Sequence, residues 1–314
     1  MNYNQWIGPT LLTTGLLASA AAIRGCDSNR IEPLTAAKAK ERIEGLAVLT
    51  DAEHEERRAY AIIINGSTDG DMLEDVVFAY NDLRRVGFQE ENIFVLAEVA
   101  PRNDGPGLIT AEAKPETVAI INNYLEQLVD ENDLLLVYMA SHGYKNENQF
   151  YLQGHGNKWS VFDMEIRGEK ISLSVTLDPG LLEVRPLLDT YYDLSPGELV
   201  IVGNFCYSGI VTSHIEKRLA EDQNTRQGAA IASTTEDKRS YGWVFGRALF
   251  GQMGRSDEKV DTNNDGQNSL VELIDYTRTL HNGQPIEKEK ESIVLNQVSS
   301  VSTLPVEYLV NPNN

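Results

Sequence analysis

The strongest constraint on the fold is a set of short, almost uniformly apolar runs spread along the chain. They occupy residues 59–66, 92–98, 133–143, 198–206 and 228–234. Runs of this length that are apolar on both faces are typical of strands buried in the middle of a parallel sheet. Parallel neighbours need crossover connections, so the chain between the runs has to return across a face of the sheet, usually as a helix.

The segments between the runs have the periodicity of amphipathic helices. Residues 71–87 place five apolar side chains on one stripe before Gly87 ends the helix: Leu73, Val76, Val77, Tyr80 and Leu83. Further helices are expected within residues 115–130, 178–194, 213–222, 241–253 and 270–282. Strands that alternate with helices predict a doubly wound α/β fold, with a mostly parallel central sheet and helices on both faces.

The charge of the chain excludes some classes of partner. There are 47 Asp and Glu residues against 27 Lys and Arg, which gives a formal net charge of -20. Such a surface repels the phosphates of nucleic acids and anionic lipid headgroups, so we expect no nucleic-acid partner. Two cysteines cannot form a disulfide framework, so the stability has to come from the hydrophobic core.

The amino-terminal stretch differs from the rest of the chain. Residues 6–23 are uncharged and mostly apolar, but the run is shorter than the roughly 20 residues of a spanning helix and is broken by Gly and Pro. We therefore interpret residues 1–25 as an export segment. Residues 23–26 resemble a bacterial lipoprotein cleavage box with Cys26 as the lipidated residue, although Arg24 is unusual there. The alternatives are an uncleaved membrane anchor and a disordered tail.

The chain then divides into three parts. Residues 1–25 are the export segment, residues 26–58 a linker or peripheral helix, and residues 59–314 the globular domain. We expect an exported protein that is periplasmic, extracellular or lipid-anchored at the cell surface. It would contact a membrane only through its amino-terminal signal or lipid. The oligomeric state is left open.

His142 and Cys206 each close an apolar run, and this shared position is the main functional signal. In an open α/β sheet the ligand site lies beyond the carboxyl ends of the strands. An imidazole can take the proton of a thiol and later give a proton to a leaving amine, as acyl transfer requires. Gly143 fits beside them, because a glycine amide approaches an oxyanion without hindrance. The alternative is that Cys206 is a core residue, as many cysteines are.

Four motifs in order then resemble the caspase-hemoglobinase cysteine peptidases, and among them most closely the legumain branch. The motifs are EDVVFAYNDLRRVGF (74–88), LLLVYMASHG (134–143), LVIVGNFCYSG (199–209) and AAIASTTEDKRSY (229–241). The resemblance implies a central sheet of about six strands. It also implies a cysteine endopeptidase that cleaves peptides through a thioester acyl-enzyme without a cofactor. His142 and Cys206 would be its catalytic dyad, and the amides of Gly143 and Cys206 its oxyanion hole.

The chain departs from this family where the substrate would be selected. Asn204 stands two residues before the cysteine, where legumain-like enzymes have an acidic residue. The loop after the first strand carries Asp69 and Asp71 in place of an Asn and an Arg, and Arg247 lies near a position that is acidic in legumains. With Ser233, these residues are predicted to bind substrate. Asp71 would favour a basic side chain and Arg247 an acidic one, or both are solvated surface charges, so the P1 residue stays open.

Residues 261–272 match the spacing of a calcium-binding loop at every required position. The ligands would be oxygens of Asp261, Asn263, Asp265, Gln267 and Glu272. Asn268 stands where paired EF-hands have an apolar residue, so we expect a lone, structural calcium site. The alternative is an acidic turn that caps a helix at Ser269.

The leading hypothesis is therefore a cysteine endopeptidase acting on protein or peptide substrates. Two alternatives remain. A transamidase or ligase would use the same dyad but pass the acyl group to an amine instead of water. A catalytically silent, calcium-braced protein would only bind peptides.

Overall fold

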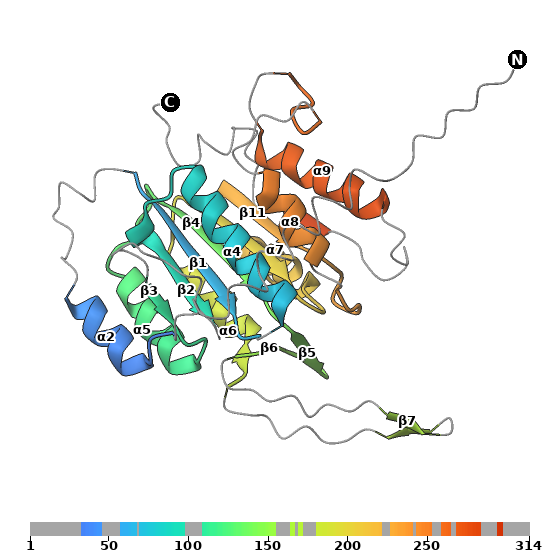
Figure 1. Ribbon diagram of the computed structural model, residues 1–314, viewed down its shortest axis with the longest axis horizontal. Coiled ribbons are helices and arrows are strands. Elements are labelled where there is room, and N and C mark those ends of the chain that lie inside the picture. Colours follow the sequence, from blue (N-terminus) through green and yellow to red (C-terminus); the bar gives the residue numbers. More distant parts are fainter. Residues whose placement is uncertain are drawn as a thin grey trace, which may run out of the picture.

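The computed structural model shows one central sheet covered by helices (Figure 1). It describes residues 33–45, 57–67, 69–97, 109–154, 164–166, 169–171, 180–221, 227–240, 243–252, 259–264, 268–283 and 294–297.

Seven strands within the described residues form the central sheet, in the order β12-β11-β10-β4-β1-β2-β3. They are β1 (Ala59–Asn65), β2 (Ile93–Ala97), β3 (Ile109–Ala111), β4 (Leu134–Ala140), β10 (Glu198–Asn204), β11 (Gln227–Ala232) and β12 (Val294–Gln297). All neighbours pair in parallel except β12, which is antiparallel to β11 at one edge. The predicted doubly wound, mostly parallel sheet is confirmed, with one strand more than the expected six.

The apolar runs became strands because both faces of the sheet are covered. Every residue of β1, β2, β4 and β10 is buried. A strand with water on one face would alternate between apolar and polar residues, and these strands do not. The run at residues 133–143 ends as a strand at Ala140, and the chain beyond it leaves the sheet.

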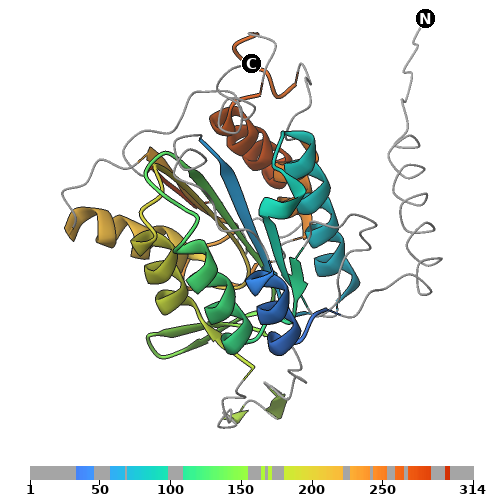
Figure 2. The same cartoon turned by 90° about the vertical axis from the view of Figure 1, so that its left-hand side faces the viewer.

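Helices form one layer on each face of the sheet (Figure 2). The first layer contains α4 (Gly70–Arg85), α8 (Trp243–Gln252) and α9 (Leu270–Gly283). The second contains α2 (Ala36–Glu44), α5 (Pro115–Leu125), α6 (Val184–Asp193) and α7 (Gly209–Glu221). A short 3-10 helix, η2 (Glu90–Asn92), precedes β2. The helices predicted from periodicity are thus present, with shifted ends.

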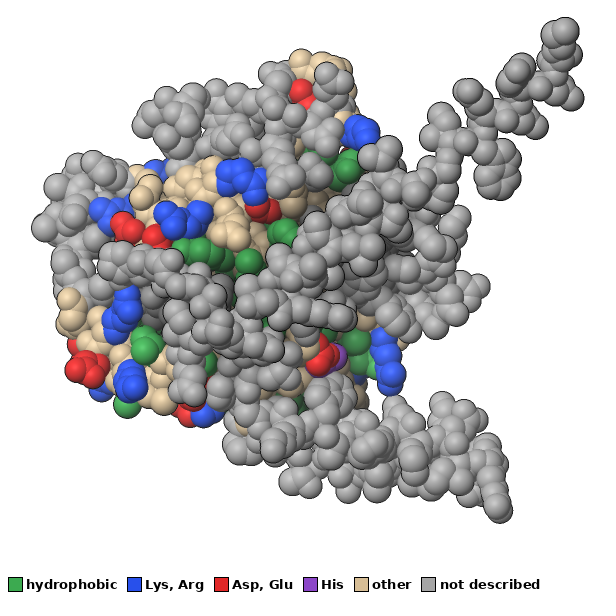
Figure 3. All heavy atoms as spheres, viewed as in Figure 1, with side chains coloured by type: hydrophobic (Ala, Val, Ile, Leu, Met, Phe, Trp, Pro, Cys, Tyr) green, Lys and Arg blue, Asp and Glu red, His purple; other side chains and the backbone are tan. Residues whose placement is uncertain are grey.

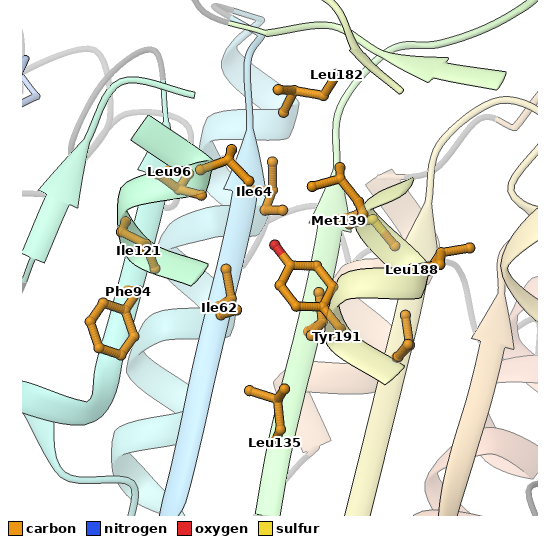
Figure 4. Close-up of a cluster of buried hydrophobic side chains, with 14 of the residues drawn as sticks. Ile62, Ile64, Phe94, Leu96, Ile121, Leu135, Met139, Leu182, Leu188 and Tyr191 are labelled. Atoms are coloured by element: carbon orange, nitrogen blue, oxygen red, sulfur yellow. The ribbon is translucent and has the colours of Figure 1, made fainter. Parts of the chain in front are cut away.

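Alternate side chains of each strand pack into the two layers. Figure 4 shows part of the second layer, where Ile62 and Ile64 of β1 and Leu135 and Met139 of β4 lie beneath Tyr191 of α6. Full burial of one such aliphatic side chain contributes about 1.5–3 kcal/mol relative to exposure. The continuous apolar strands therefore supply the core on both faces.

One residue of the predicted apolar stripe on α4 does not face the core. Val77 is 41% exposed, whereas Val76, Tyr80 and Leu83 are buried together with Ala79. The fully buried Ala79 lies in the core-facing stripe in place of Val77. Gly87 ends this helix as predicted, with a φ of 107° that favours glycine.

A smaller antiparallel sheet follows β4 and was not predicted. It consists of β5 (Gly143–Asn146), β6 (Gln149–Leu152) and β9 (Leu182–Glu183), and β9 shortens the helix expected within residues 178–194. A separate hairpin contains β7 (Met164–Ile166) and β8 (Glu169–Ile171).

The described part of residues 26–58 contains α2, which packs against α5 and β3. Leu34 forms a parallel bridge with Ala111, and its carbonyl accepts a hydrogen bond from the amide of Glu112. Residues 1–32, with the predicted export segment and Cys26, lie outside the described residues. Among the helices that are described, none is long and apolar enough to cross a membrane.

Candidate active site

The register of two neighbouring strands brings the predicted dyad to one edge of the sheet. β4 and β10 pair in parallel, and their last paired residues are Ala140 and Asn204. His142 and Cys206 each lie two residues beyond that pair. Both residues therefore leave the sheet at the same edge, from adjacent strands, as the sequence predicts.

Gly143 fixes the approach of the two loops. A Cβ atom at this position would overlap the carbonyl oxygen of Cys206 and lie 2.8 Å from the ring of Phe205. Real Cβ atoms essentially never come within 3.0 Å of such neighbours. The backbone that follows His142 thus lies directly against the backbone of Cys206, and glycine is required for this contact.

The thiol of Cys206 is partly exposed and lies at the start of a turn with a strained backbone. Cys206 is partly exposed, unlike the buried strand before it, so it is not a sealed core residue. Its Sγ donates a hydrogen bond to the carbonyl of Ser240 at 3.7 Å. The next residue, Tyr207, has a φ of 68°, which a bulky side chain rarely adopts. This turn redirects the chain from β10 into α7.

His142 is paired with an acidic residue from the loop after β1. Its Nε2 lies 2.7 Å from Oδ2 of Asp69. Figure 3 shows that Lys and Arg side chains lie among Asp and Glu side chains on one face of the molecule. Asp69 is in turn placed by Ser67, whose Oγ accepts a hydrogen bond from the amide of Asp69, while the amide of Ser67 donates to Oδ1 of Asn65.

The backbone of His142 is held by a buried serine. Oγ of Ser141 accepts a hydrogen bond from the amide of Gly66 and donates one to the carbonyl of Gln153. The amide of Gln153 donates to the carbonyl of His142 at 2.9 Å. These bonds connect the ends of β1, β4 and β6, so the position of His142 depends on three strands.

Asn204 belongs to a buried polar cluster beneath the site. Its Nδ2 donates to Oδ2 of Asp75 and to the hydroxyl of Tyr138, each at 3.0 Å. Asn204 is only 3% exposed. Burial, and secondly the charge of Asp75, raise the pKa of Tyr138, so its hydroxyl remains protonated. The predicted contact of Asn204 with substrate stays a prediction.

Ser233 lies under the site and does not reach its surface. The side chain is fully buried, and its hydroxyl is within hydrogen-bond distance of the hydroxyls of Ser208 (3.2 Å) and Ser240 (2.8 Å). In this conformation Ser233 supports the turn that carries Cys206. Direct binding of substrate by this side chain stays a prediction.

The other two predicted specificity residues are placed only by their backbone. Asp71 lies in the first turn of α4 and Arg247 lies in α8. Their side chains are outside what the structure describes, so their roles remain predictions.

Sequence reasoning missed Tyr144 as a neighbour of the thiol. Burial and then the charge of Cys206 raise the pKa of Tyr144 well above its ordinary range, so the phenol keeps its proton. Its place directly after Gly143 was the available signal. The pairing of Asp69 with His142 was also missed. No sequence pattern shows which side chain a carboxylate in the loop after a strand will contact.

Glu272 holds the predicted calcium loop together. Its Oε1 accepts hydrogen bonds from the amides of Thr262 and Asn263 and the hydroxyl of Thr262, and its Oε2 from the amide and hydroxyl of Ser269. The amide of Glu272 donates back to Oγ of Ser269, which completes a capping box. Burial opposes ionisation of Glu272, but the hydrogen bonds outweigh it and lower its pKa to about 2.

In the described residues, the carboxylate of Glu272 acts as a helix cap and not as an open calcium ligand. Both oxygens that would bind the ion are already saturated by five donors, so the described residues fit the capping alternative better. No group of metal-ligating side chains occurs among the described residues. Asp265 and Gln267 lie outside them, and Asp261 and Asn263 are described, so calcium binding stays a prediction.

Comparison with known proteins adds little to this geometry. No protein-family model matches the chain, and no curated protein matches it. Among solved structures, the chain is similar to a secreted C11 cysteine protease from Bacteroides thetaiotaomicron in complex with an irreversible peptide inhibitor. The identity is 11% and the TM-score 0.33, over 78% of this chain and 67% of that one. So weak a likeness carries no weight for activity, and the residues of this site have to carry the functional conclusion.

Proposed function

We propose that this protein is a cysteine peptidase in which Cys206 is the nucleophile and His142 the general base and acid. The observation that carries the proposal is the register of β4 and β10, which puts both residues two positions beyond one residue pair. The close approach of Gly143 to Cys206 and the partial exposure of the thiol support it.

The proposed reaction begins with transfer of the Cys206 proton to His142. Because Nε2 faces Asp69, the nitrogen that serves the thiol would be Nδ1. The thiolate attacks the carbonyl carbon of the scissile peptide bond, and the amides of Gly143 and Cys206 stabilise the oxyanion. The C–N bond then breaks, and the imidazolium gives its proton to the leaving amine.

The acyl group is now a thioester on Cys206. Water attacks it while His142 takes a proton from the water, and the carbon–sulfur bond breaks to release the thiolate and the carboxylic acid product, which gives its remaining proton to the solvent. An amine in the place of water would give a transamidase. The legumain branch remains a proposal at this level, because Asn204 replaces the acidic residue of that branch.

Asp69 would act as a positioning residue in this mechanism. A carboxylate 2.7 Å from Nε2 fixes the tautomer of His142 and stabilises the imidazolium that forms when the thiol loses its proton. The substrate contact predicted for Asp69 stays a prediction beside this role.

The proposal is tested on the full chain with an iodoacetamide probe and a peptide library, with cleavage sites read by mass spectrometry. The wild type should be labelled at Cys206 and should cleave peptides, and Cys206→Ala and His142→Ala should each abolish turnover. His214→Ala is the matched control. His214 lies on α7 and is also paired with an aspartate, Asp189 of α6. Substantial turnover by either site variant would contradict the dyad.

The same assay separates the related activities. Products that carry an added amine nucleophile would identify a transamidase or ligase. Peptide binding by the wild type without cleavage would identify a silent binding protein. We further propose, from residues 6–23, that the protein is exported, which amino-terminal sequencing of the mature protein checks.

A further inference from the structure

The ammonium group of Lys145 is held in place at the edge of the candidate site. It lies in β5, two residues after Gly143, and its side chain is exposed. Its Nζ donates a hydrogen bond to the carbonyl of Glu236 at 3.3 Å and lies 5.0 Å from the centre of the ring of Phe150. Phe150 is only 2% exposed, so packing in the core holds its ring in place. These contacts restrict the ammonium group to one region.

The segment that Lys145 reaches lies against the turn of the nucleophile. The amide of Tyr207, next to Cys206, donates a hydrogen bond to the carbonyl of Lys238 at 2.8 Å. A Cβ atom on Gly209 would overlap the amide of Glu236, so the two backbones touch. Lys145 and Lys238 therefore belong to the two segments that border Cys206.

Within the part of the chain that the structure describes, neither lysine forms an ion pair with a carboxylate. The acidic neighbours are engaged elsewhere: Oε1 of Glu236 accepts from Ser213, and Oδ1 of Asp237 accepts from Thr235 at 2.6 Å.

The charges of the two lysines affect the pKa of one of these acidic neighbours, Asp237. The hydrogen bond from Thr235, and more weakly the charges of Lys238 and Lys145, lower the pKa of Asp237. Asp69, the acidic residue beside the histidine, is paired with His142. The ammonium group of Lys145 thus lies against the segment that borders Cys206, and Lys238 belongs to that segment through its backbone.

We propose that Lys145 and Lys238 form a cationic subsite that selects peptide substrates with an acidic side chain close to the scissile bond. This inference rests on the proposed function and adds the substrate class. The net charge of -20 repels acidic polypeptides over most of the surface, so the preference has to arise locally, from these residues. An exposed ion pair contributes up to about 1 kcal/mol, so we expect about a three- to fivefold effect per lysine.

The test uses pairs of peptides that differ only by Glu or Gln at each of three positions on either side of the cleaved bond. At one or more positions the wild type should show a kcat/KM about tenfold higher for Glu, and added salt should reduce this preference. Lys145→Gln and Lys238→Gln should each remove part of it, and Lys145→Glu should reverse it. Lys217→Gln is the control, because Lys217 is paired with Glu221 far along α7.

Two results would overturn the subsite. One is equal cleavage of all Glu and Gln pairs by the wild type, and the other is an equal loss for both peptides in Lys145→Gln. Failure of the proposed function is a different result, namely no cleavage of any peptide. In that case the binding of the same pairs to Cys206→Ala measures the subsite alone, and equal affinity for Glu and Gln peptides would refute it.

Discussion

The imidazole of His142 and the carboxylate of Asp69 meet at 2.7 Å although 73 positions separate them in the chain. Asp69 follows β1 and His142 follows β4, and these strands are parallel neighbours in the sheet. The carboxyl edge of the sheet thus joins three loops, those after β1, β4 and β10. Their combined geometry gives the following predictions.

Asp69→Asn should lower kcat by about ten- to a hundredfold with little change in KM. An amide cannot stabilise the imidazolium, and the loss should stay below the 10² to 10⁴ of the general acid–base residue itself. The alkylation rate of Cys206 should fall in parallel, which a purely structural role would not cause. Asp189→Asn, which alters the other described His–Asp pair, is the control, and equal losses in both variants would contradict this role.

Gly143→Ala should abolish activity and destabilise the fold by about 1–3 kcal/mol. The added methyl group would overlap the carbonyl of Cys206 and contact Phe205, so the two loops would have to separate. Gly251→Ala is the matched control, because nothing lies within 4 Å of a Cβ at that helical position. It should be neutral or stabilising by up to about 1 kcal/mol. Chemical unfolding and turnover report both effects, and an active Gly143→Ala variant would refute the close approach.

Asp133, at the start of β4, should make the protein less stable as the pH rises. Burial, against hydrogen bonds from the amides of Asp130 and Arg58, raises its pKa from 3.8 to about 6. A raised carboxyl pKa gives stability that is complete below about pH 4 and is lost as the pH passes 6. The full effect is at most about 3 kcal/mol.

The measurement is chemical unfolding of the wild type and Asp133→Asn between pH 4 and pH 8. The free energy of unfolding of the wild type should fall relative to the variant across this range. Subtracting the free energy of unfolding of the variant from that of the wild type cancels the contribution of other titrating groups. One of these is Glu272, whose lowered pKa has the opposite effect on stability at acid pH. A difference independent of pH would contradict the raised pKa of Asp133.

Glu272→Gln should destabilise the protein by about 1–3 kcal/mol in the presence of a chelator. The substitution weakens hydrogen bonds from Thr262, Asn263 and Ser269 to a charged acceptor. Glu221→Gln at the exposed end of α7 is the control. The calcium prediction is tested separately, because a bound ion would have to displace these hydrogen-bond donors from Glu272. If calcium binds, it should raise the Tm of the wild type but not the Tm of Asp261→Asn. No loss of stability in Glu272→Gln would refute the capping role.

The paired edge strands show what periodicity cannot detect. β12 was not expected, because its four residues, VLNQ, mix apolar and polar side chains. β5 and β6 were likewise missed, since most residues of β5 are not buried. Such strands form because a neighbouring strand offers hydrogen bonds to their backbone, and that partner is not visible in the local sequence.

The candidate site was likewise predicted only in part from the sequence. The positions of His142 and Cys206 followed from two apolar runs, because parallel strands end at one edge. The roles of Asp69 and Ser233 did not follow. A polar residue in a loop can face solvent, substrate or another side chain, and the tertiary structure turned one toward His142 and buried the other.

From the sequence alone the central strands, the helical layers and the edge where the thiol and the imidazole lie could be predicted, because burial on both faces gives uniformly apolar strands and the helices between them have a helical period. Which polar groups pair across the fold, such as Asp69 with His142 and Lys145 with Glu236, became visible only with the folded chain. Hydrogen bonds and ion pairs depend on the positions of a few atoms, and those positions are fixed only when distant segments have packed together.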